Sequence, residues 1–176
     1  MSPINYRVAA TSVEREGHFA VRHAVFVEEQ QLFEGTDRDA VDEQAVHIVA
    51  VEAESGAVVG AVRCFPADDE IWYGSRLAVT PTHRRQGGSI GSHLCRLAEQ
   101  LMVERSAGRF LAFIQIQNVR FFKHLGWLPV GKPVMHCGVE HQIMEAALHR
   151  ERGTWQPGPQ PRLPSESASS VAGATR

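Results

Sequence analysis

The sequence predicts a single mixed α/β domain. Strand-like and helix-like segments alternate over residues 1–150 in the order β-α-β-β-β-α-β-α-β-β, and the composition is that of an ordinary globular protein, with 43% apolar and 22% charged residues. A doubly wound parallel sheet would need a stricter alternation of strands and helices. The 176 residues are enough to bury a substantial core as one domain.

The first half of the chain carries one helical pattern and four strand patterns. Apolar side chains recur at three- and four-residue steps over residues 14–30, which predicts an amphipathic helix. Gly74 interrupts the last strand pattern, which indicates a β-bulge or a close backbone approach. Strands are expected at residues 5–10, 45–53, 57–65 and 70–79, with a turn at 54–56 joining the middle two.

The second half of the chain predicts two helices and three strands. One helix begins near residues 89–91 and is ended by Gly108, and a second is capped by Asn118 and ended by Gly126. Strands are expected at residues 110–116, 127–135 and 141–148. The proline-rich tail, residues 151–176, is predicted to be disordered, and its one aromatic residue, Trp155, either packs onto the domain or is exposed.

A glycine-rich loop connects the strand that ends at Val79 to the following helix. Free N–H groups and the positive end of the helix dipole meet at such a helix N-terminus, and they favour an anion. Glycines allow a close backbone approach, and Arg84 and Arg85 add charge suited to phosphate. These features predict a pyrophosphate site, although a plain glycine turn with two solvated arginines remains an alternative. A Walker loop is excluded because Gly-Lys-Ser/Thr is absent, and a dinucleotide fingerprint is excluded because GGSIG does not fit G-x-G-x-x-G.

Two segments resemble motifs of the GNAT acyltransferase superfamily. Residues 77–98, LAVTPTHRRQGGSIGSHLCRLA, are similar to motif A, a strand followed by R/Q-x-x-G-x-G/A and a helix. Both Arg84-x-x-Gly87-x-Ser89 and Gln86-x-x-Ser89-x-Gly91 fit that motif, so its register stays open. Residues 113–127, FIQIQNVRFFKHLGW, are similar to motif B.

This resemblance implies a mostly antiparallel, mixed sheet flanked by helices, with a splayed central pair of strands. It also implies an N-acetyltransferase that uses acetyl-CoA or another acyl-CoA as co-substrate. Many members carry a tyrosine in motif B as the general acid, whereas this chain has Phe121 and Phe122 there, which cannot donate a proton. The residues implied to bind the cofactor are Leu77, Ala78, Val79, Arg84, Arg85, Gln86, Gly87, Gly88, Ser89, Ile90, Gly91, Ser92 and Asn118.

The N-terminal half resembles a branch of the same fold, the acyl-homoserine-lactone synthases. Matching pairs are Arg22 with Phe26, Asp39 with Asp42, Gly60 with Arg63, and Ser75 with Arg76, whereas Gly74 replaces the glutamate usual in that branch. We prefer to interpret the chain as a general acetyltransferase-like member of the superfamily. An acyl-homoserine-lactone-synthase-like enzyme is the alternative. The residues implied to contact the substrate are Arg22, Phe26, Arg63 and Arg76.

An attacking amine must lose a proton, which a carboxylate or an imidazole can accept. The candidates are Glu29, predicted on the same helical face as Arg22 and Phe26, together with Asp42 and His141. An acidic loop in which Asp42 pairs with an arginine is the alternative for that residue. We expect no metal site at residues 135–141, MHCGVEH, because no second ligand pair has structural spacing and Gly138 indicates a hairpin turn.

The expected acceptor is the amine of a small molecule or a peptide, which attacks the thioester directly in a ternary complex. A non-catalytic CoA-binding regulatory module is a further alternative. The net charge of −2 gives no support for a nucleic-acid partner, and no apolar run is long enough for a membrane span. Three cysteines at unrelated spacings indicate the reducing cytoplasm, and a homodimer is left open.

Overall fold

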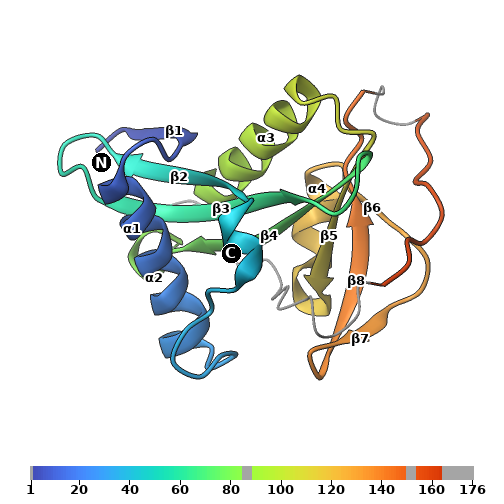
Figure 1. The fold of residues 1–176 in the computed structure, drawn as a ribbon, viewed down its shortest axis with the longest axis horizontal. Helices are drawn as coiled ribbons and strands as arrows, with labels where there is room; N and C mark the ends of the chain where they lie inside the picture. Colours follow the sequence, from blue (N-terminus) through green and yellow to red (C-terminus); the bar gives the residue numbers. More distant parts are fainter. Residues whose placement is uncertain (1, 85–88, 150–153, 164–176) are drawn as a thin grey trace.

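The computed structural model describes residues 2–84, 89–149 and 154–163. Its strands form one mixed, mostly antiparallel sheet in the order β1-β2-β3-β4-β5-β8-β6, with β7 paired to β8 (Figure 1). This confirms the predicted fold class. The strands are β1 (Ile4–Val8), β2 (Val46–Glu52), β3 (Val58–Pro66), β4 (Ile71–Val79), β5 (Arg109–Gln115), β6 (Leu128–Pro129), β7 (Val134–His136) and β8 (Val139–Glu145).

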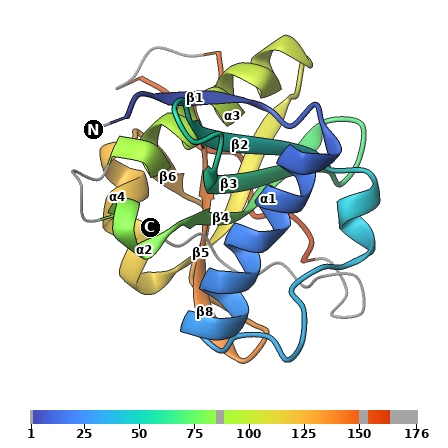
Figure 2. The same ribbon diagram turned by 90° about the vertical axis from the view of Figure 1, so that its left-hand side faces the viewer.

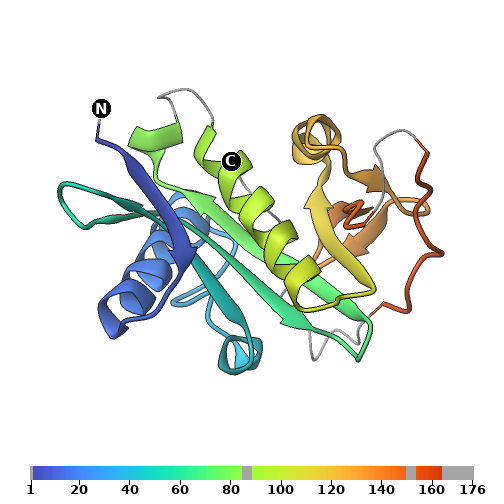
Figure 3. The same ribbon diagram turned by 90° about the horizontal axis from the view of Figure 1, so that it is seen from above.

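Helices cover both faces of the sheet. Val21 of α1 packs against Ala61 of β3 and Ala78 of β4, whereas Leu94 of α3 and Phe122 of α4 belong to the main core on the opposite face. Figures 2 and 3 show α1 and α3 on opposite sides of the strands. The helical segments are α1 (Ser12–Arg22), η1 (His23–Glu29), η2 (Ala40–Glu43), α2 (Pro81–Arg84), α3 (Ser89–Glu104), η3 (Ile116–Asn118) and α4 (Val119–His124).

The segment predicted as one helix over residues 14–30 is an α-helix that continues as a π-helix. Thr11 begins it with a capping box, in which the Glu14 backbone N–H donates to the Thr11 hydroxyl over 3.1 Å. The π-helical part, η1, ends with the N–H of Gln30 donating to the carbonyl of Val25, five residues back. Apolar periodicity does not separate the two helix types, since they differ by less than one residue per turn.

The central strands β4 and β5 are parallel and pair over only three residues. The register joins Ile71 to Arg109, Trp72 to Phe110 and Tyr73 to Leu111, and pairing stops there. Both strands continue beyond this point and diverge, which Figure 3 shows from above. The predicted splayed pair is therefore confirmed, and we call the open part between the two strands the fork.

A β-bulge lies in β4 near the start of the fork. The Cα partners change from Ala61 and Ala78 to Arg63 and Ser75, so β4 holds one residue more than β3 over this interval. Arg76 takes the left-handed conformation there, with φ of +56°. The bulge thus lies two residues beyond Gly74, the position at which the sequence indicated an irregularity.

The bulge changes which face of the sheet the β4 side chains reach. Tyr73 lies in the same core cluster as Leu111 of β5, whereas Leu77 and Val79 lie in the main core with Ile114. Without the bulge, the odd-numbered residues of β4 would all face one side. The extra residue therefore moves the odd-numbered side chains of the second half of β4, Leu77 and Val79, to the α3 face.

Gly74 itself is required by a close contact. A Cβ atom at this position would lie 2.9 Å from Cζ of Phe110, which is closer than real Cβ contacts allow. The close approach that the sequence indicated is therefore confirmed, and its partner is an aromatic ring on β5.

The C-terminal half differs from the sequence prediction in two places. The strand expected over residues 127–135 is two short strands, β6 and β7, because Gly131 with φ of +63° and Pro133 interrupt it. Asn118 stands at the N-cap of α4 as predicted, but its side chain makes no capping hydrogen bond.

The described part of the predicted disordered tail packs onto the domain. Trp155 is only 7% exposed, and the Gly158 N–H donates to Oε2 of Glu145 over 3.0 Å. Glu145 also binds Arg109 at the start of β5, with 2.7 Å between Oε2 and Nη2. Trp155 and Gly158 thus contact the domain, whereas residues 151–153 and 164–176 lie outside the described part. None of the helices in the described ranges is long and apolar enough to cross a membrane.

Candidate functional site

In the fork, the second half of β4 is no longer paired to β5. Beyond Tyr73, the β5-facing edge of β4 has no ladder partner on β5, while its other edge pairs with β3. The side chains of Leu77, Ala78 and Val79 are buried in the cores. The β5-facing edge of these residues therefore consists of backbone N–H and C=O groups.

The N-terminus of α3 lies next to this edge in the chain. β4 ends at Val79, α2 follows, and α3 begins at Ser89. Gly91 in the first turn of α3 is buried, and a Cβ there would lie 3.6 Å from Phe121 Cζ, so this turn packs against α4. The helix of 16 residues presents its free N–H groups and positive dipole end here.

Part of the expected phosphate loop cannot be placed. Ile90, Gly91, Ser92 and Asn118 lie in described elements, and Ile90 and Asn118 are buried. The remaining expected positions, Arg85, Gln86, Gly87 and Gly88, lie outside the residues that the structure describes, as does the side chain of Ser89.

Arg84 and Glu29 bind each other. The Arg84 Nη1 donates to Glu29 Oε1 over 2.9 Å, and its Nε donates to the Val79 carbonyl over 2.7 Å. Arg84 therefore links the end of β4 to η1. The Glu29 side chain is partly exposed rather than turned inward beside Arg22 and Phe26, because the π-helical turn and its ion pair direct it toward α2.

Three arginines predicted to contact substrate form a buried ion-pair network. Arg22, Arg63 and Arg76 are each 0% exposed. Arg22 Nε donates to Asp37 Oδ2 over 2.7 Å, and Arg76 Nε approaches the same oxygen at 3.1 Å. Asp37 was not a sequence candidate. The sequence did offer a signal for Asp37, because it lies two residues before Asp39 in the same acidic loop. With Asp42, this loop supplies one aspartate for each of the three arginines of the network.

Asp39 and Asp42 complete the network. Asp39 Oδ1 accepts from Arg63 Nη1 over 2.6 Å, and Asp42 Oδ1 accepts from Arg22 Nη1 over 2.6 Å. Burial acts to raise the pKa of Asp42, but the hydrogen bond from Arg22 and the charge of Arg63 outweigh it and hold that pKa far below its ordinary value. The sequence analysis gave an acidic loop paired with an arginine as the alternative to a catalytic role. The structure contains such pairs, with Arg63 fully buried.

The network leaves little room for substrate. Phe26 and the three arginines have no exposed surface, so a substrate would reach them only if the loop that carries the aspartates moved. Asp42 is a weak base in this setting because its carboxylate already accepts two charge-assisted hydrogen bonds from Arg22. The geometry favours a structural role for Asp42 over proton transfer.

His141 is the remaining candidate proton acceptor. It lies on β8 opposite Gln115, at the end of β5 that is far from the three residues paired with β4. Its Nδ1 is 2.8 Å from the Val139 carbonyl, so Nδ1 carries the proton and Nε2 has the lone pair. Burial lowers the pKa of His141, although the bond to Val139 opposes the shift. The ring is 2% exposed, and Nε2 has no hydrogen-bond partner within the described residues.

The segment MHCGVEH forms the predicted hairpin. Cys137 and Gly138 have φ of +50° and +74° and connect β7 to β8. The rings of His136 and His141 pack edge to face, with centroids 5.5 Å apart. Across the described ranges, no group of three or more histidine, cysteine or acidic residues is arranged to hold a metal ion.

Comparison with known proteins agrees with this geometry. Residues 12–127 match the model of the acetyltransferase (GNAT) family. The chain is 29% identical to the uncharacterised N-acetyltransferase YjcF of Bacillus subtilis over 140 residues, which is 78% of this chain and 95% of the relative.

Two solved structures have a similar fold. An acyl-CoA N-acyltransferase from Pseudomonas aeruginosa has a TM-score of 0.68 at 18% identity, over 84% of this chain and 100% of the other. BjaI, a CoA-dependent acyl-homoserine lactone synthase, has a TM-score of 0.63 at 22% identity, over 82% of each chain. With the family model matching well over half of its length, this chain belongs to the acetyltransferase (GNAT) family.

Proposed function

We propose that the protein transfers an acyl group from acyl-CoA to the amine of a small molecule or a peptide. The observation that carries this proposal is the fork, whose unpaired β4 edge leads to the N-terminus of α3. The pantetheine arm of CoA bears amide groups that can pair with a strand edge, and its diphosphate suits a helix N-terminus. The solved structure of BjaI contains isopentyl-CoA, which supports a CoA thioester as the donor in this fold.

The proposed chemistry is direct attack in a ternary complex. The amine nitrogen attacks the thioester carbonyl carbon, the C–S bond breaks, and the CoA thiolate leaves. Backbone N–H groups of β4 in the fork stabilise the oxyanion. An acyl-enzyme at Cys64 or Cys95 is disfavoured because burial raises the pKa of Cys64 to about 12 and that of Cys95 well above its ordinary value.

His141 Nε2 is the proposed acceptor of the amine proton. Of the three candidates, Asp42 is bound by two arginines and Glu29 by one, whereas Nε2 of His141 accepts no hydrogen bond within the described residues, although a substrate must displace its buried surroundings to reach it. The motif B phenylalanines, Phe121 and Phe122, supply no proton, so the departing thiolate takes its proton from water or from the substrate.

Cofactor binding is tested by calorimetry with CoA and acetyl-CoA on a matched pair of variants. Ser92→Glu adds a negative charge in the first turn of α3, and Gln100→Glu adds the same charge about 12 Å further along the helix. We expect Ser92→Glu to weaken binding about tenfold and Gln100→Glu to change it less than twofold. Failure of the native protein to bind either ligand would overturn the proposal.

Catalysis is tested by release of free thiol from acetyl-CoA with a panel of amines. Turnover with an amine supports the enzyme, whereas binding without turnover supports the regulatory module. S-Adenosylmethionine belongs in the same panel because the structure of BjaI holds this molecule, and lactone formation from it would favour the synthase alternative.

The role of His141 is tested by His141→Gln, with exposed His124→Gln as the control. We expect His141→Gln to lower kcat by about 10²- to 10⁴-fold and to remove the acidic limb of the pH–rate profile, because proton acceptance is lost. Affinity for CoA should stay unchanged. An intact pH profile in this variant would show that another group takes the proton.

A further inference from the structure

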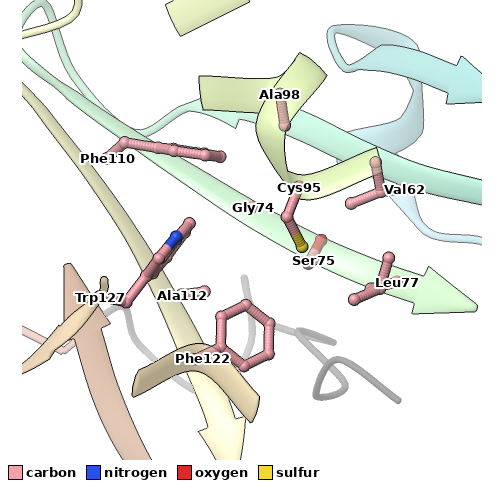
Figure 4. A pocket seen from close by; sticks show the side chains of 10 residues that line it. All are labelled: Val62, Gly74, Ser75, Leu77, Cys95, Ala98, Phe110, Ala112, Phe122 and Trp127. Atoms are coloured by element: carbon pink, nitrogen blue, oxygen red, sulfur yellow. The ribbon is translucent and has the colours of Figure 1, made fainter. Parts of the chain in front are cut away.

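The inner part of the fork is filled by apolar side chains. Figure 4 shows Phe110 near the point where β4 and β5 approach each other, and Leu77 and Phe122 further toward the open end. The cavity that these and neighbouring side chains enclose has a volume of only about 20 Å³, which is room for about one water molecule. A ligand therefore meets β4 first at its outer end, where the strand finishes at Val79 and has diverged from β5.

The backbone carbonyl of Val79 faces the fork at this outer end. The Thr80 N–H, which belongs to the same peptide unit, donates to the Val59 carbonyl of β3 over 2.9 Å. This peptide bond is trans, and in a trans unit the C=O and N–H groups point in opposite directions. The Val79 carbonyl is therefore directed away from β3, toward the fork.

An arginine of α2 binds this carbonyl. Arg84 Nε donates to the Val79 oxygen over 2.7 Å, and both Nη atoms of the same guanidinium group bind the Glu29 carboxylate at the end of η1. Figures 2 and 3 show α2 beside the N-terminal end of α3, where the proposed function places the cofactor diphosphate. One side chain thus covers a backbone acceptor of the fork and carries a charge that suits the diphosphate.

The ion pair between Arg84 and Glu29 is of the kind that exchanges at low cost. The two side chains keep 21% and 39% of their surface exposed, and water and salt screen such pairs. A diphosphate can accept two parallel hydrogen bonds from the guanidinium group, as the carboxylate does. An amide N–H of pantetheine can replace Arg84 Nε at the Val79 carbonyl. The cofactor therefore leaves neither group without a partner.

We propose that CoA displaces Arg84 from Glu29 and from the Val79 carbonyl, and that the guanidinium group then binds the cofactor diphosphate. This inference rests on the proposed acyl-CoA function. Arg84 is a positioning residue of the cofactor site, and Glu29 holds it over the end of β4 until the cofactor arrives. The Glu29 carboxylate and the diphosphate compete for one guanidinium group, so Glu29 lowers the affinity for CoA.

Calorimetry with CoA on Glu29→Gln tests this competition. We expect the variant to bind CoA about two- to fivefold tighter than the native protein, because the cofactor no longer has to break an exposed ion pair. The control is Glu28→Gln, which removes the same charge from the adjacent, more exposed position and should change the affinity less than twofold. An unchanged or weaker affinity in Glu29→Gln, or an equal gain in both variants, would overturn the proposal.

Arg84→Gln identifies the group for which Glu29 competes. We expect its CoA affinity to fall about tenfold through loss of the contact with the diphosphate. Adding Glu29→Gln to this variant should change the affinity no further, because the carboxylate then has no guanidinium group to hold. The same gain from Glu29→Gln with and without Arg84 would overturn the exchange.

The outcomes separate this inference from the function on which it rests. Absence of CoA binding by the native protein would overturn the proposed function itself, whereas binding that is insensitive to Glu29 would overturn the exchange alone. Folding of each variant is checked by thermal unfolding. If Arg84→Gln does not fold, the comparison of Glu29→Gln with Glu28→Gln still decides the proposal.

Discussion

The fork and the arginine–aspartate network contrast in how they use their polar and charged groups. In the network, three buried arginines meet three aspartates of the same chain, and the charges cancel. In the fork, strand pairing stops after three residues, and an apolar cavity lies between the strands. Sequence resemblance marks both regions as functional. The contrast teaches that the region whose backbone groups lack partners is the better candidate for ligand binding.

The network nevertheless includes a residue of the fork strand β4, Arg76. Its arginines come from α1, β3 and β4, and its aspartates come from the loop between residues 36 and 43. Arg76 is also the left-handed residue of the β4 bulge. The ion pairs therefore stabilise the bulge that turns Leu77 toward the fork, and the network acts on the site by positioning it.

Removal of one network charge should give the largest effect on stability. Asp37→Asn leaves two buried guanidinium groups, those of Arg22 and Arg76, without their shared carboxylate. We expect the free energy of unfolding to fall by about 3–5 kcal/mol, as for other broken buried ion pairs. Urea denaturation measures this loss. The control is Glu16→Gln, which breaks an exposed pair with Arg38 and should cost less than about 1 kcal/mol. Equal losses would contradict the contrast between buried and exposed pairs.

A methyl group at the root of the fork should have an intermediate effect. Gly74→Ala brings a Cβ to within 2.9 Å of the Phe110 ring and should destabilise the protein by about 1–3 kcal/mol through overpacking. Phe110→Leu should rescue part of this loss when the two changes are combined. A double-mutant cycle measures the coupling, and strict additivity would show that the contact does not limit residue 74.

Acid should lower the stability of the folded protein, because two buried histidines, His18 and His47, have lowered pKa values. Burial and the charge of Arg22 lower the pKa of His18 well below its ordinary value, and burial lowers that of His47. The unfolded chain therefore binds more protons than the folded one below about pH 6.5, so stability present at higher pH is lost as the pH falls. Asp42 does not titrate in this range, because its pKa is depressed below ordinary carboxylate values.

Urea midpoints at several pH values between 7.5 and 5 measure this acid effect. His18→Gln should flatten the dependence, and the exposed His124→Gln should leave its slope as in the native protein. A native slope retained in His18→Gln would assign the effect to other groups.

The smallest effect on stability is expected at the partly exposed ion pair between Glu29 and Arg84. Glu29→Gln removes the partly exposed ion pair with Arg84, so the free energy of unfolding should fall by less than about 1 kcal/mol, and by less still at high salt. Thermal unfolding at two salt concentrations checks this. A hundredfold loss of kcat in the same variant would instead restore Glu29 as the proton acceptor and remove His141 from that role.

Much of the fold could be predicted because its signals are local. Residues 45–65 carry β-rich runs around a turn, and the segment from Ser89 to Gly108 has helical periodicity with a glycine stop. The missed features depend on distant contacts. Asp37 gains its role only when α1 and β4 bring arginines to it. Trp155 is followed by Gly158, whose N–H donates to Glu145, a residue distant in the sequence.

The candidate site, like the fold, could be predicted where its signals are local and could not where it depends on distant contacts. The backbone edge near Leu77 follows from the family motif. The small apolar cavity between β4 and β5 is lined by side chains from separate strands and helices and has no local pattern in the sequence. The sequence placed Glu29 on the helical face of Arg22 and Phe26 by assuming an α-helix, whereas η1 is a π-helix with a different number of residues per turn and the Glu29 side chain is partly exposed.

The bulge at Arg76 divides β4 into two parts in which opposite parities of residue number face a given side of the sheet. Upstream of it, odd-numbered side chains such as Tyr73 face the α1 side, and downstream of it odd-numbered ones such as Leu77 face α3. Deleting a single residue at this point would remove this change of parity and move every downstream side chain to the wrong core. Alignments and grafts across this strand must therefore preserve its length as strictly as its residues.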